Sequence, residues 1–326
     1  MLTEPGDPAR VAIVGAGMAG LSCATALTAR GHTVQLFDKG RGAGGRMSTR
    51  RIETSAGDAQ FDHGAQYFTA RDPDFTALVR AWEARGLVAR WPAAGPEAWV
   101  GYPGMNSVVR DCANLHRVMY GQQVKSLARS DDKWQVLTAD GSYGRFKIVV
   151  LAIPAEQAAP LLALHDLDLA QQAMHARSQP CWTAMLAFDA PLAFEGDVHR
   201  GTGPIVWAAR NSTKPGRTGP EAWVIQASAQ WSAQHVEADQ ASVTAELIRM
   251  FELEIGERLP AVIAAQAHRW RFALSAGTGL GALLNANIGL GVCGDWLLGP
   301  RVECAWLSGQ RLAELVGCQT DEPEQV

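Results

Sequence analysis

Long hydrophobic runs are missing from this 326-residue sequence: no window holds the roughly 18 to 20 uninterrupted apolar residues that a membrane span needs. The six cysteines form no CxxC pair and the eight histidines show no metal-ligand spacing, so neither a disulfide frame nor a zinc site is expected. Charge of one sign is not in excess, because the net charge is -4, which gives no general attraction for nucleic acid or membrane. We therefore expect a cytoplasmic protein with a small-molecule partner and no bound metal.

The sequence does contain a strand-helix-strand pattern near its start. Residues Val11 to Val14 form a short apolar run, and a second apolar run extends from Val34 to Phe37. Between these runs, Leu21, Ala24 and Leu27 recur at helical spacing. Hydrophobic residues make up 47% of the chain, which is enough for a substantial core. The pattern predicts an α/β fold that begins with a Rossmann-type domain.

The turn between the first strand and the helix reads Gly-Ala-Gly-Met-Ala-Gly, residues 15–20. Gly15 allows a tight turn, Gly17 lets the backbone approach a pyrophosphate, and Gly20 permits close packing of the helix on the sheet. Asp38, at the end of the second strand, can accept hydrogen bonds from an adenosine ribose. The spacing therefore predicts dinucleotide binding at the helix N-terminus. The expected backbone contacts come from Gly15, Gly17, Met18, Ala19 and Gly20.

A second glycine-rich segment, from Lys39 to Arg46, follows the acidic residue directly. It resembles the second motif of the amine-oxidase-like flavoproteins, in which this segment runs under the pyrophosphate toward the isoalloxazine ring. Its glycines would let the backbone come close to the cofactor, and its arginines would supply positive charge beside the pyrophosphate. The resemblance implies a noncovalently bound FAD rather than NAD. The residues that it places at the cofactor are Lys39, Arg41, Gly44, Gly45 and Arg46.

A third segment lies far along the chain, where Gly294 and Asp295 precede a predicted helix from Val302 to Val316. In flavoproteins of this class, such a Gly-Asp pair contacts the ribityl chain and phosphate, and the following helix points its N-terminus at the pyrimidine end of the flavin. That helix end would stabilise the negative charge of the reduced flavin. The resemblance implies cofactor contacts from Gly294, Asp295, Val302 and Ala305, with a backbone contact from Val124 to adenine.

Four further segments resemble one family, the renalase-like flavoproteins, and together they span nearly the whole chain. They are Phe61–Asp72, Ala208–Pro215, His268–Arg271 and Cys293–Trp296. The resemblance implies that Gly64, Ala65 and Gln66 contact the flavin. It also implies oxidation of NAD(P)H isomers that carry the hydride at ring position 2 or 6. The hydride would pass to flavin N5 and then to O2, giving NAD(P)+ and hydrogen peroxide. Phe272 stands where animal members carry histidine, which leaves the ring position open.

Together these patterns predict a two-dinucleotide-binding-domain flavoprotein: a Rossmann-type FAD domain with an antiparallel meander, plus a mixed-sheet α+β substrate domain. The meander is expected from Gln122–Ala128, Trp134–Leu137 and Phe146–Ala152. The FAD-binding domain would comprise residues 1–70, 101–155 and 286–326, and the substrate domain residues 71–100 and 156–285. The glycine-rich stretch Gly277 to Gly281 follows no clear strand in the sequence, so a second nucleotide-binding domain is not expected.

For the substrate wall, aromatic rings could hold a flat ring against the flavin, and an arginine could bind a phosphate. The predicted wall residues are Gln66, Tyr67, Trp207, Asn211, Trp270, Arg271 and Trp296. Tryptophan and tyrosine are also common core residues, so each of these positions could equally be structural. His63 and His268 are interpreted as structural histidines with satisfied hydrogen bonds.

Two other functions remain open from the sequence. One is a flavin amine or amino-acid oxidase, which would surround its amine with an aromatic cage. The other is an FAD-binding redox protein without turnover. The proposed isomer oxidation needs no catalytic base, because it converts a dihydropyridine to an aromatic pyridinium, and this fits the absence of a Ser/His/Asp signature.

Overall fold

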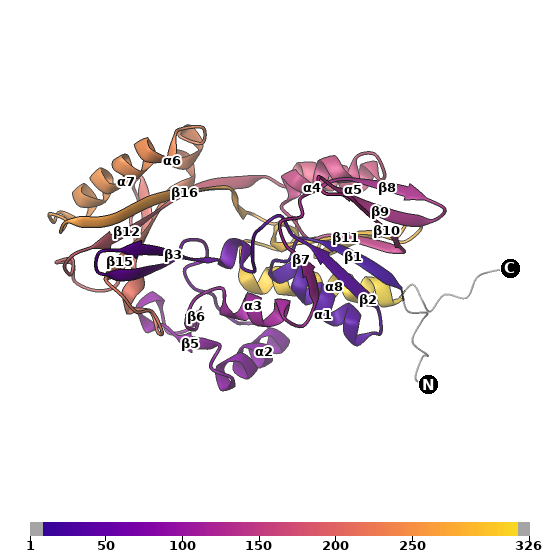
Figure 1. The fold of residues 1–326 in the computed structure, drawn as a ribbon, viewed down its shortest axis with the longest axis horizontal. Helices are drawn as coiled ribbons and strands as arrows, with labels where there is room; N and C mark the ends of the chain where they lie inside the picture. Colours follow the sequence, from indigo (N-terminus) through magenta and orange to yellow (C-terminus); the bar gives the residue numbers. More distant parts are fainter. Residues whose placement is uncertain (1–8, 319–326) are drawn as a thin grey trace. The chain divides into compact units, whose positions relative to one another are not determined.

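The computed structural model describes residues 9–318, which form two compact units (Figure 1). The first unit combines residues 9–45, 109–178 and 275–318, and the second combines residues 46–108 and 179–274. The predicted fold class is confirmed, because the first unit is a Rossmann-type α/β domain and the second combines helices with antiparallel strands. Within the described range, no helix is both long and apolar enough to cross a membrane.

The first unit is built around a six-stranded sheet with the strand order β17-β18-β11-β1-β2-β7. Strand β1 runs parallel to β11 and β2, β18 and β7 continue the parallel part, and β17 is an antiparallel edge strand. β1 is buried from Val11 to Val14, as expected for a strand covered on both faces. The main elements are β1 (Arg10–Val14), α1 (Met18–Ala29), β2 (Thr33–Phe37), α3 (Ser107–Ala113), β7 (Arg117–Met119), β8 (Val124–Ser130), β9 (Lys133–Thr138), β10 (Ser142–Phe146), β11 (Ile148–Leu151), α4 (Ala155–Leu162), α5 (Leu167–His175), β17 (Ala282–Asn285), β18 (Leu290–Cys293) and α8 (Val302–Cys318).

Helices α1 and α8 pack on each other in this unit (Figure 1). Gly309 in α8 makes the close approach possible, because a Cβ atom there would collide with the carbonyl oxygen of Ala19 and the backbone nitrogen of Cys23. The hydroxyl of Ser22 also donates a hydrogen bond of 2.7 Å to the carbonyl of Trp306. The C-terminal helix is therefore packed against the first helix of the chain, although the two are far apart in sequence.

The antiparallel meander is present, with β9 between β8 and β10. Turns at Asp131 and Asp140 separate its strands. The predicted third strand, Phe146–Ala152, is wrong in extent. Its first residue ends β10, and the rest forms β11 of the parallel sheet. The change of sheet occurs at Lys147, whose N–H bonds to the carbonyl of Arg10, and an apolar run in the sequence does not show such a break.

The second unit contains a five-stranded sheet with the order β13-β14-β15-β12-β16. Helix α7 packs against β14 and β15, and buries Val243, Leu247, Met250 and Phe251. The main elements are β3 (Thr49–Thr54), β4 (Gly57–Asp62), α2 (Pro73–Ala84), β5 (Val88–Arg90), β6 (Trp99–Gly101), β12 (Ser178–Phe188), β13 (Val198–His199), β14 (Ile205–Arg210), β15 (Glu221–Ala227), α6 (Ala229–Gln234), α7 (Gln240–Ile255) and β16 (Val262–Ser275).

The limits of the two units differ from the predicted domain limits. Residues 46–70, which the sequence places in the FAD-binding domain, belong to the second unit because Ala59 and Phe61 of the β3–β4 hairpin pack against Met185 and Val224 of the large sheet. Residues 101–108 belong to the second unit as well.

Residues 156–178, which the sequence places in the substrate domain, belong to the first unit instead. Helices α4 and α5 lie in this segment, and their residues Leu162 and Ala170 are buried in one core with Leu127 of the meander. Residues 275–285 also belong to the first unit, since β17 pairs with β18.

The glycine-rich stretch from Gly277 to Gly281 does follow a strand, contrary to the prediction, because β16 ends at Ser275. It leads into β17 rather than into a helix. A helix N-terminus after the glycines is what a dinucleotide fingerprint requires, so this stretch is not a second fingerprint.

Candidate functional site: a flavin cradle and an aromatic wall

The N-terminus of α1 offers backbone N–H groups beside an open space. Gly15 has a φ of 102°, and a Cβ atom on it would collide with the carbonyl of Ala152, while one on Gly20 would collide with the carbonyl of Gly15. Gly17 differs, because a Cβ atom there would meet nothing within 4 Å. Among residues 9–318, no side chain caps this helix, and its first turn has no acidic residue. Packing explains the first and third glycines, whereas the second leaves the room that a pyrophosphate needs.

Asp38 organises the loop next to this helix end. One carboxylate oxygen accepts a hydrogen bond of 2.7 Å from the backbone N–H of Ala16, and the other accepts one of 2.7 Å from Gly40. The N–H of Gln122 bonds to the Asp38 carbonyl, which brings the start of β8, and with it Val124, to the same loop. Asp38 is only partly buried, so its remaining lone pairs can accept from a ribose hydroxyl.

The segment after Asp38 presents polar groups and backbone to solvent. Lys39 and Arg41 are exposed, and a Cβ atom on Gly45 would lie 3.9 Å from the Cα of Gly17. Gly44 is buried and has a φ of 150°. The structure therefore brings the second glycine-rich motif to the first one, as a shared dinucleotide cradle requires.

The third predicted cofactor segment is also part of the first unit. The N–H of Gly294 donates a hydrogen bond of 2.8 Å to Ser308 of α8, and Asp295 is buried. Val302 begins α8 and Ala305 lies in its first turn. The first turn also holds Glu303, which forms an ion pair with Arg301.

In the second unit, the residues from His63 to Tyr67 cross the large sheet. Gln226 of β15 donates a hydrogen bond of 2.9 Å to the carbonyl of Gly64, and the indole N–H of Trp270 on β16 donates one of 2.7 Å to the carbonyl of His63. The N–H of Ala65 bonds to the carbonyl of Arg46. The two sheet strands thus fix the segment that the resemblance assigns to the flavin.

An aromatic wall forms where this segment meets β14. The rings of Tyr67 and Trp207 lie 5.6 Å apart at 34°, and the guanidinium of Arg200 lies 4.4 Å from the Trp207 ring centroid. The indole N–H of Trp207 is buried and has no hydrogen-bond partner in the described part of the chain. A buried donor without a partner costs free energy, so a ligand or water is expected to accept from it. Tyr67 and Trp207 therefore form an aromatic pair on this wall, while Trp270 stacks on the ring of His63.

Four of the seven predicted wall residues have other roles. The amide of Asn211 is fully buried, where it accepts from the N–H of Asp62 and donates to the carbonyl of Gln60. The amide of Gln66 is likewise occupied inside the unit, since it accepts from Lys214 and donates to two backbone carbonyls. These internal bonds give both amides a structural role within the second unit.

Arg271 and Trp296 are the other two. Arg271 forms a two-point ion pair with Glu237 (2.6 and 2.7 Å) on the side of β16 opposite to Trp270, because neighbouring residues of a strand face opposite sides. Trp296 is 1% exposed in the core of the first unit and donates to the carbonyl of Ile153. The prediction that Trp296 contacts substrate is therefore wrong, and a phosphate would have to displace Glu237 from Arg271.

A buried ionic cluster, which sequence reasoning missed, supports the segment from the inside. Asp62 has no solvent exposure and accepts hydrogen bonds from Thr49 (2.7 Å) and the N–H of Met105 (3.0 Å). Its second oxygen pairs with Lys214 (3.3 Å) and Arg217. Burial alone would raise the pKa of Asp62, but the two cations lower it to about 2. Burial lowers the pKa of Lys214 to about 8.

The interpretation of His63 as a satisfied histidine is wrong for one of its nitrogens. Its Nδ1 is buried without a partner in the described chain, and its ring stacks on Trp270 (5.2 Å, 27°) and meets His268 edge-on at 5.0 Å. Burial, followed by the charges of its surroundings, lowers the pKa of His63 to about 3. Burial and then Arg50 lower the pKa of His268 to about 4. Both rings are neutral at physiological pH.

This pair should make the protein less stable in acid. Below pH 6.5 the unfolded chain binds protons at both imidazoles, whereas the folded chain does not, so the free energy of unfolding falls by up to about 1.4 kcal/mol per pH unit for each histidine. We expect urea unfolding of His63→Phe to depend less on pH between 7 and 4.5 than that of the parent. The exposed His175→Gln is the control. Equal pH dependence in His63→Phe and the parent would contradict the assignment.

Two known protein families match the sequence of this chain. Residues 13–82 match the NAD(P)-binding Rossmann-like domain, and residues 86–316 match the flavin-containing amine oxidoreductases. The chain belongs to the flavin-containing amine oxidoreductase family. FAD is its cofactor, and the open space at Gly17 with the uncapped α1 fits that group.

Individual relatives agree with this family. Mouse (Mus musculus) renalase is 26% identical over 297 residues, which cover 81% of this chain and 84% of that protein. Two solved structures share the fold. Cyclohexylamine oxidase from Brevibacterium oxydans IH-35A has a TM-score of 0.71 with 12% identity, covering 97% of this chain and 100% of that one. Putrescine oxidase bound to putrescine has a TM-score of 0.69 with 15% identity, covering 96% and 99%.

Proposed function

We propose that this FAD-dependent oxidase acts on dihydronicotinamide isomers, NAD(P)H with the hydride at ring position 2 or 6, and forms NAD(P)+ and hydrogen peroxide. The observation that carries the proposal is the similarity to renalase, which extends over 81% of the chain. Bound FAD supplies the two-electron redox chemistry, taking electrons from the substrate and returning them to O2. The proposal extends to a noncovalent flavin, because none of the six free cysteines occupies a recognised attachment motif.

The residues of the aromatic wall suit this substrate. Tyr67, Trp207 and Trp270 offer flat faces to a pyridine ring, and the unpaired N–H of Trp207 can donate to a carboxamide oxygen. The low pKa values of His63 and His268 make these rings poor bases. A base is not required, because loss of hydride from a dihydropyridine gives an aromatic ring without proton removal. The chain's task is to position the ring and exclude water.

An amine substrate is the second candidate, and the paired rings of Tyr67 and Trp207 favour it specifically. Aromatic rings can bind an amine through their faces, and putrescine oxidase and cyclohexylamine oxidase have the same fold. Peroxide formation with the two substrate classes separates the candidates. Turnover of isomers without turnover of amines supports the proposal, and the reverse contradicts it.

Tyr67 provides a direct test of the wall. Tyr67→Ala should lower kcat/KM for the isomers by about tenfold to a hundredfold, because the nicotinamide ring of the substrate is no longer held against the flavin. FAD should stay bound. Tyr67→Phe keeps the ring and should retain most of the activity. Arg271→Gln, on the other side of β16, should leave kcat/KM unchanged. If Arg271→Gln is the damaging variant and Tyr67→Ala is not, the wall has been assigned wrongly.

A further inference from the structure

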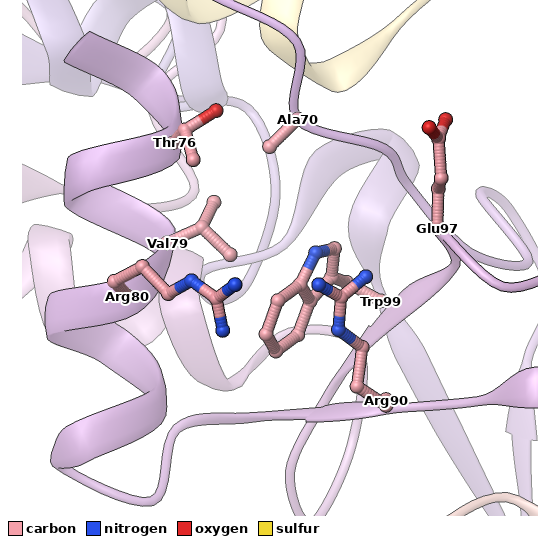
Figure 2. A pocket seen from close by; sticks show the side chains of 7 residues that line it. All are labelled: Ala70, Thr76, Val79, Arg80, Arg90, Glu97 and Trp99. Atoms are coloured by element: carbon pink, nitrogen blue, oxygen red, sulfur yellow. The ribbon is translucent and has the colours of Figure 1, made fainter. Parts of the chain in front are cut away.

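A pocket of about 130 Å³ lies in the second unit, among residues that neither the cofactor nor the proposed substrate uses. Helix α2 supplies one wall, and β5 and β6 with the loop between them supply the other (Figure 2). The lining residues are Ala70, Thr76, Val79, Arg80, Arg90, Glu97 and Trp99.

Two arginines in this pocket are held on one indole ring. The guanidinium of Arg90 lies 3.8 Å from the ring centroid of Trp99, and that of Arg80 lies 5.5 Å from it. In Figure 2 the guanidinium group of Arg90 overlaps the Trp99 ring, and that of Arg80 lies beside it. Trp99 is 3% exposed, and its backbone pairs with Phe68, so the ring is a fixed support. Stacking on a fixed ring pre-orders the arginines and lowers the entropy that binding would cost.

The side chains of both arginines carry more hydrogen-bond donors than their own contacts use. Arg80 uses Nη1 for Glu83 (2.9 Å), and Arg90 uses Nη1 for the carbonyl of Pro96 (3.2 Å). A guanidinium carries five N–H donors, so each arginine keeps others for a ligand.

We propose that this pocket binds a phosphate group, either as the free ion or as part of an ester. The side chains of Arg80, Arg90 and Thr76 line a space of suitable size, and phosphate oxygens accept hydrogen bonds from guanidinium and hydroxyl donors. Val79 and Ala70 form apolar walls, which strengthen such charge-assisted bonds by excluding water. Glu97 also lines the pocket. Its carboxylate repels an anion and therefore lowers the affinity for phosphate.

Calorimetric titration of the FAD-loaded protein with inorganic phosphate and with glycerol phosphate tests the proposal. One site should saturate, and the tighter of the two ligands identifies the source of the group. Arg90→Gln should weaken binding more than about tenfold, because a charge-assisted pair of bonds is lost. Glu97→Gln should tighten it several-fold, because a repelling charge is removed.

The control is Arg129→Gln, because Arg129 also lies over a tryptophan, Trp134 at 6.0 Å, but outside this pocket. It should bind phosphate like the parent. Thermal midpoints show whether each variant is folded, and Glu97→Gln keeps the test decisive if Arg90→Gln does not fold. The proposal is overturned if neither ligand saturates, or if Glu97→Gln and Arg129→Gln both bind like the parent.

Discussion

Gly17→Val should give a folded protein that is purified without FAD. The backbone of Gly17 has φ -82° and ψ -175°, which valine adopts freely, and a Cβ atom there meets no described residue within 4 Å. The added side chain would instead fill the space that the pyrophosphate needs at the N-terminus of α1. Affinity for FAD should fall by more than about tenfold. The measurement is the ratio of flavin to protein absorbance after purification, with far-UV circular dichroism to confirm the fold.

Two other glycines control this experiment. Gly203→Val, in the second unit, also has room for a side chain and should retain FAD. Gly20→Val should damage the fold itself, because its Cβ atom collides with the carbonyl of Gly15. Asp38 is a weaker probe, since its carboxylate also holds the backbone of Ala16 and Gly40. Full flavin content in Gly17→Val would show that the pyrophosphate does not lie at this helix.

Asp62→Asn should destabilise the protein by about 3 to 5 kcal/mol, because two buried cations lose their common carboxylate. Lys214→Met should lower the free energy of unfolding by less than Asp62→Asn does, because Asp62 then still pairs with Arg217. Urea unfolding at pH 7 measures the free energy of unfolding of both variants. The control is Glu246→Gln, which breaks the exposed ion pair of Glu246 and Arg249 and should change the free energy of unfolding little. A loss in Asp62→Asn no larger than in Glu246→Gln would show that the cluster does not stabilise the fold.

The nucleotide-binding half of the fold could be predicted because its signals are local. Strand, glycine turn, helix and acidic residue follow one another within residues 10–38, and each imposes its own geometry. The extent of the third meander strand could not be predicted, because a single residue, Lys147, separates two apolar strands that belong to different sheets. The α2 helix was predictable for the local reason that Asp72 caps it and Pro73 begins it.

The substrate wall was harder to predict, because side-chain partners there come from distant parts of the chain. Gln66 and Asn211 are polar and stand in recognisable segments, yet both serve the ionic cluster around Asp62, whose partner Lys214 is 152 residues away. Arg271 is next to Trp270, but strand alternation places it on the opposite side, against Glu237. Without knowledge of the pairing partners, a buried structural residue and a wall residue look alike in sequence.

We propose that this family member oxidises NAD(P)H isomers that carry the hydride at ring position 2 or 6. Anaerobic flavin bleaching tests this proposal most directly. The FAD-loaded protein is mixed without oxygen with 2- or 6-dihydro-NAD(P), with ordinary 4-dihydro-NADH, and with primary amines. A pocket that brings ring carbon 2 or 6 within about 3 to 3.5 Å of the flavin acceptor atom displaces carbon 4, so the isomers should bleach the flavin much faster than NADH, and amines should not bleach it. Bleaching by NADH or by a primary amine as fast as by the isomers would contradict the claim, while leaving the membership in the flavoprotein family intact.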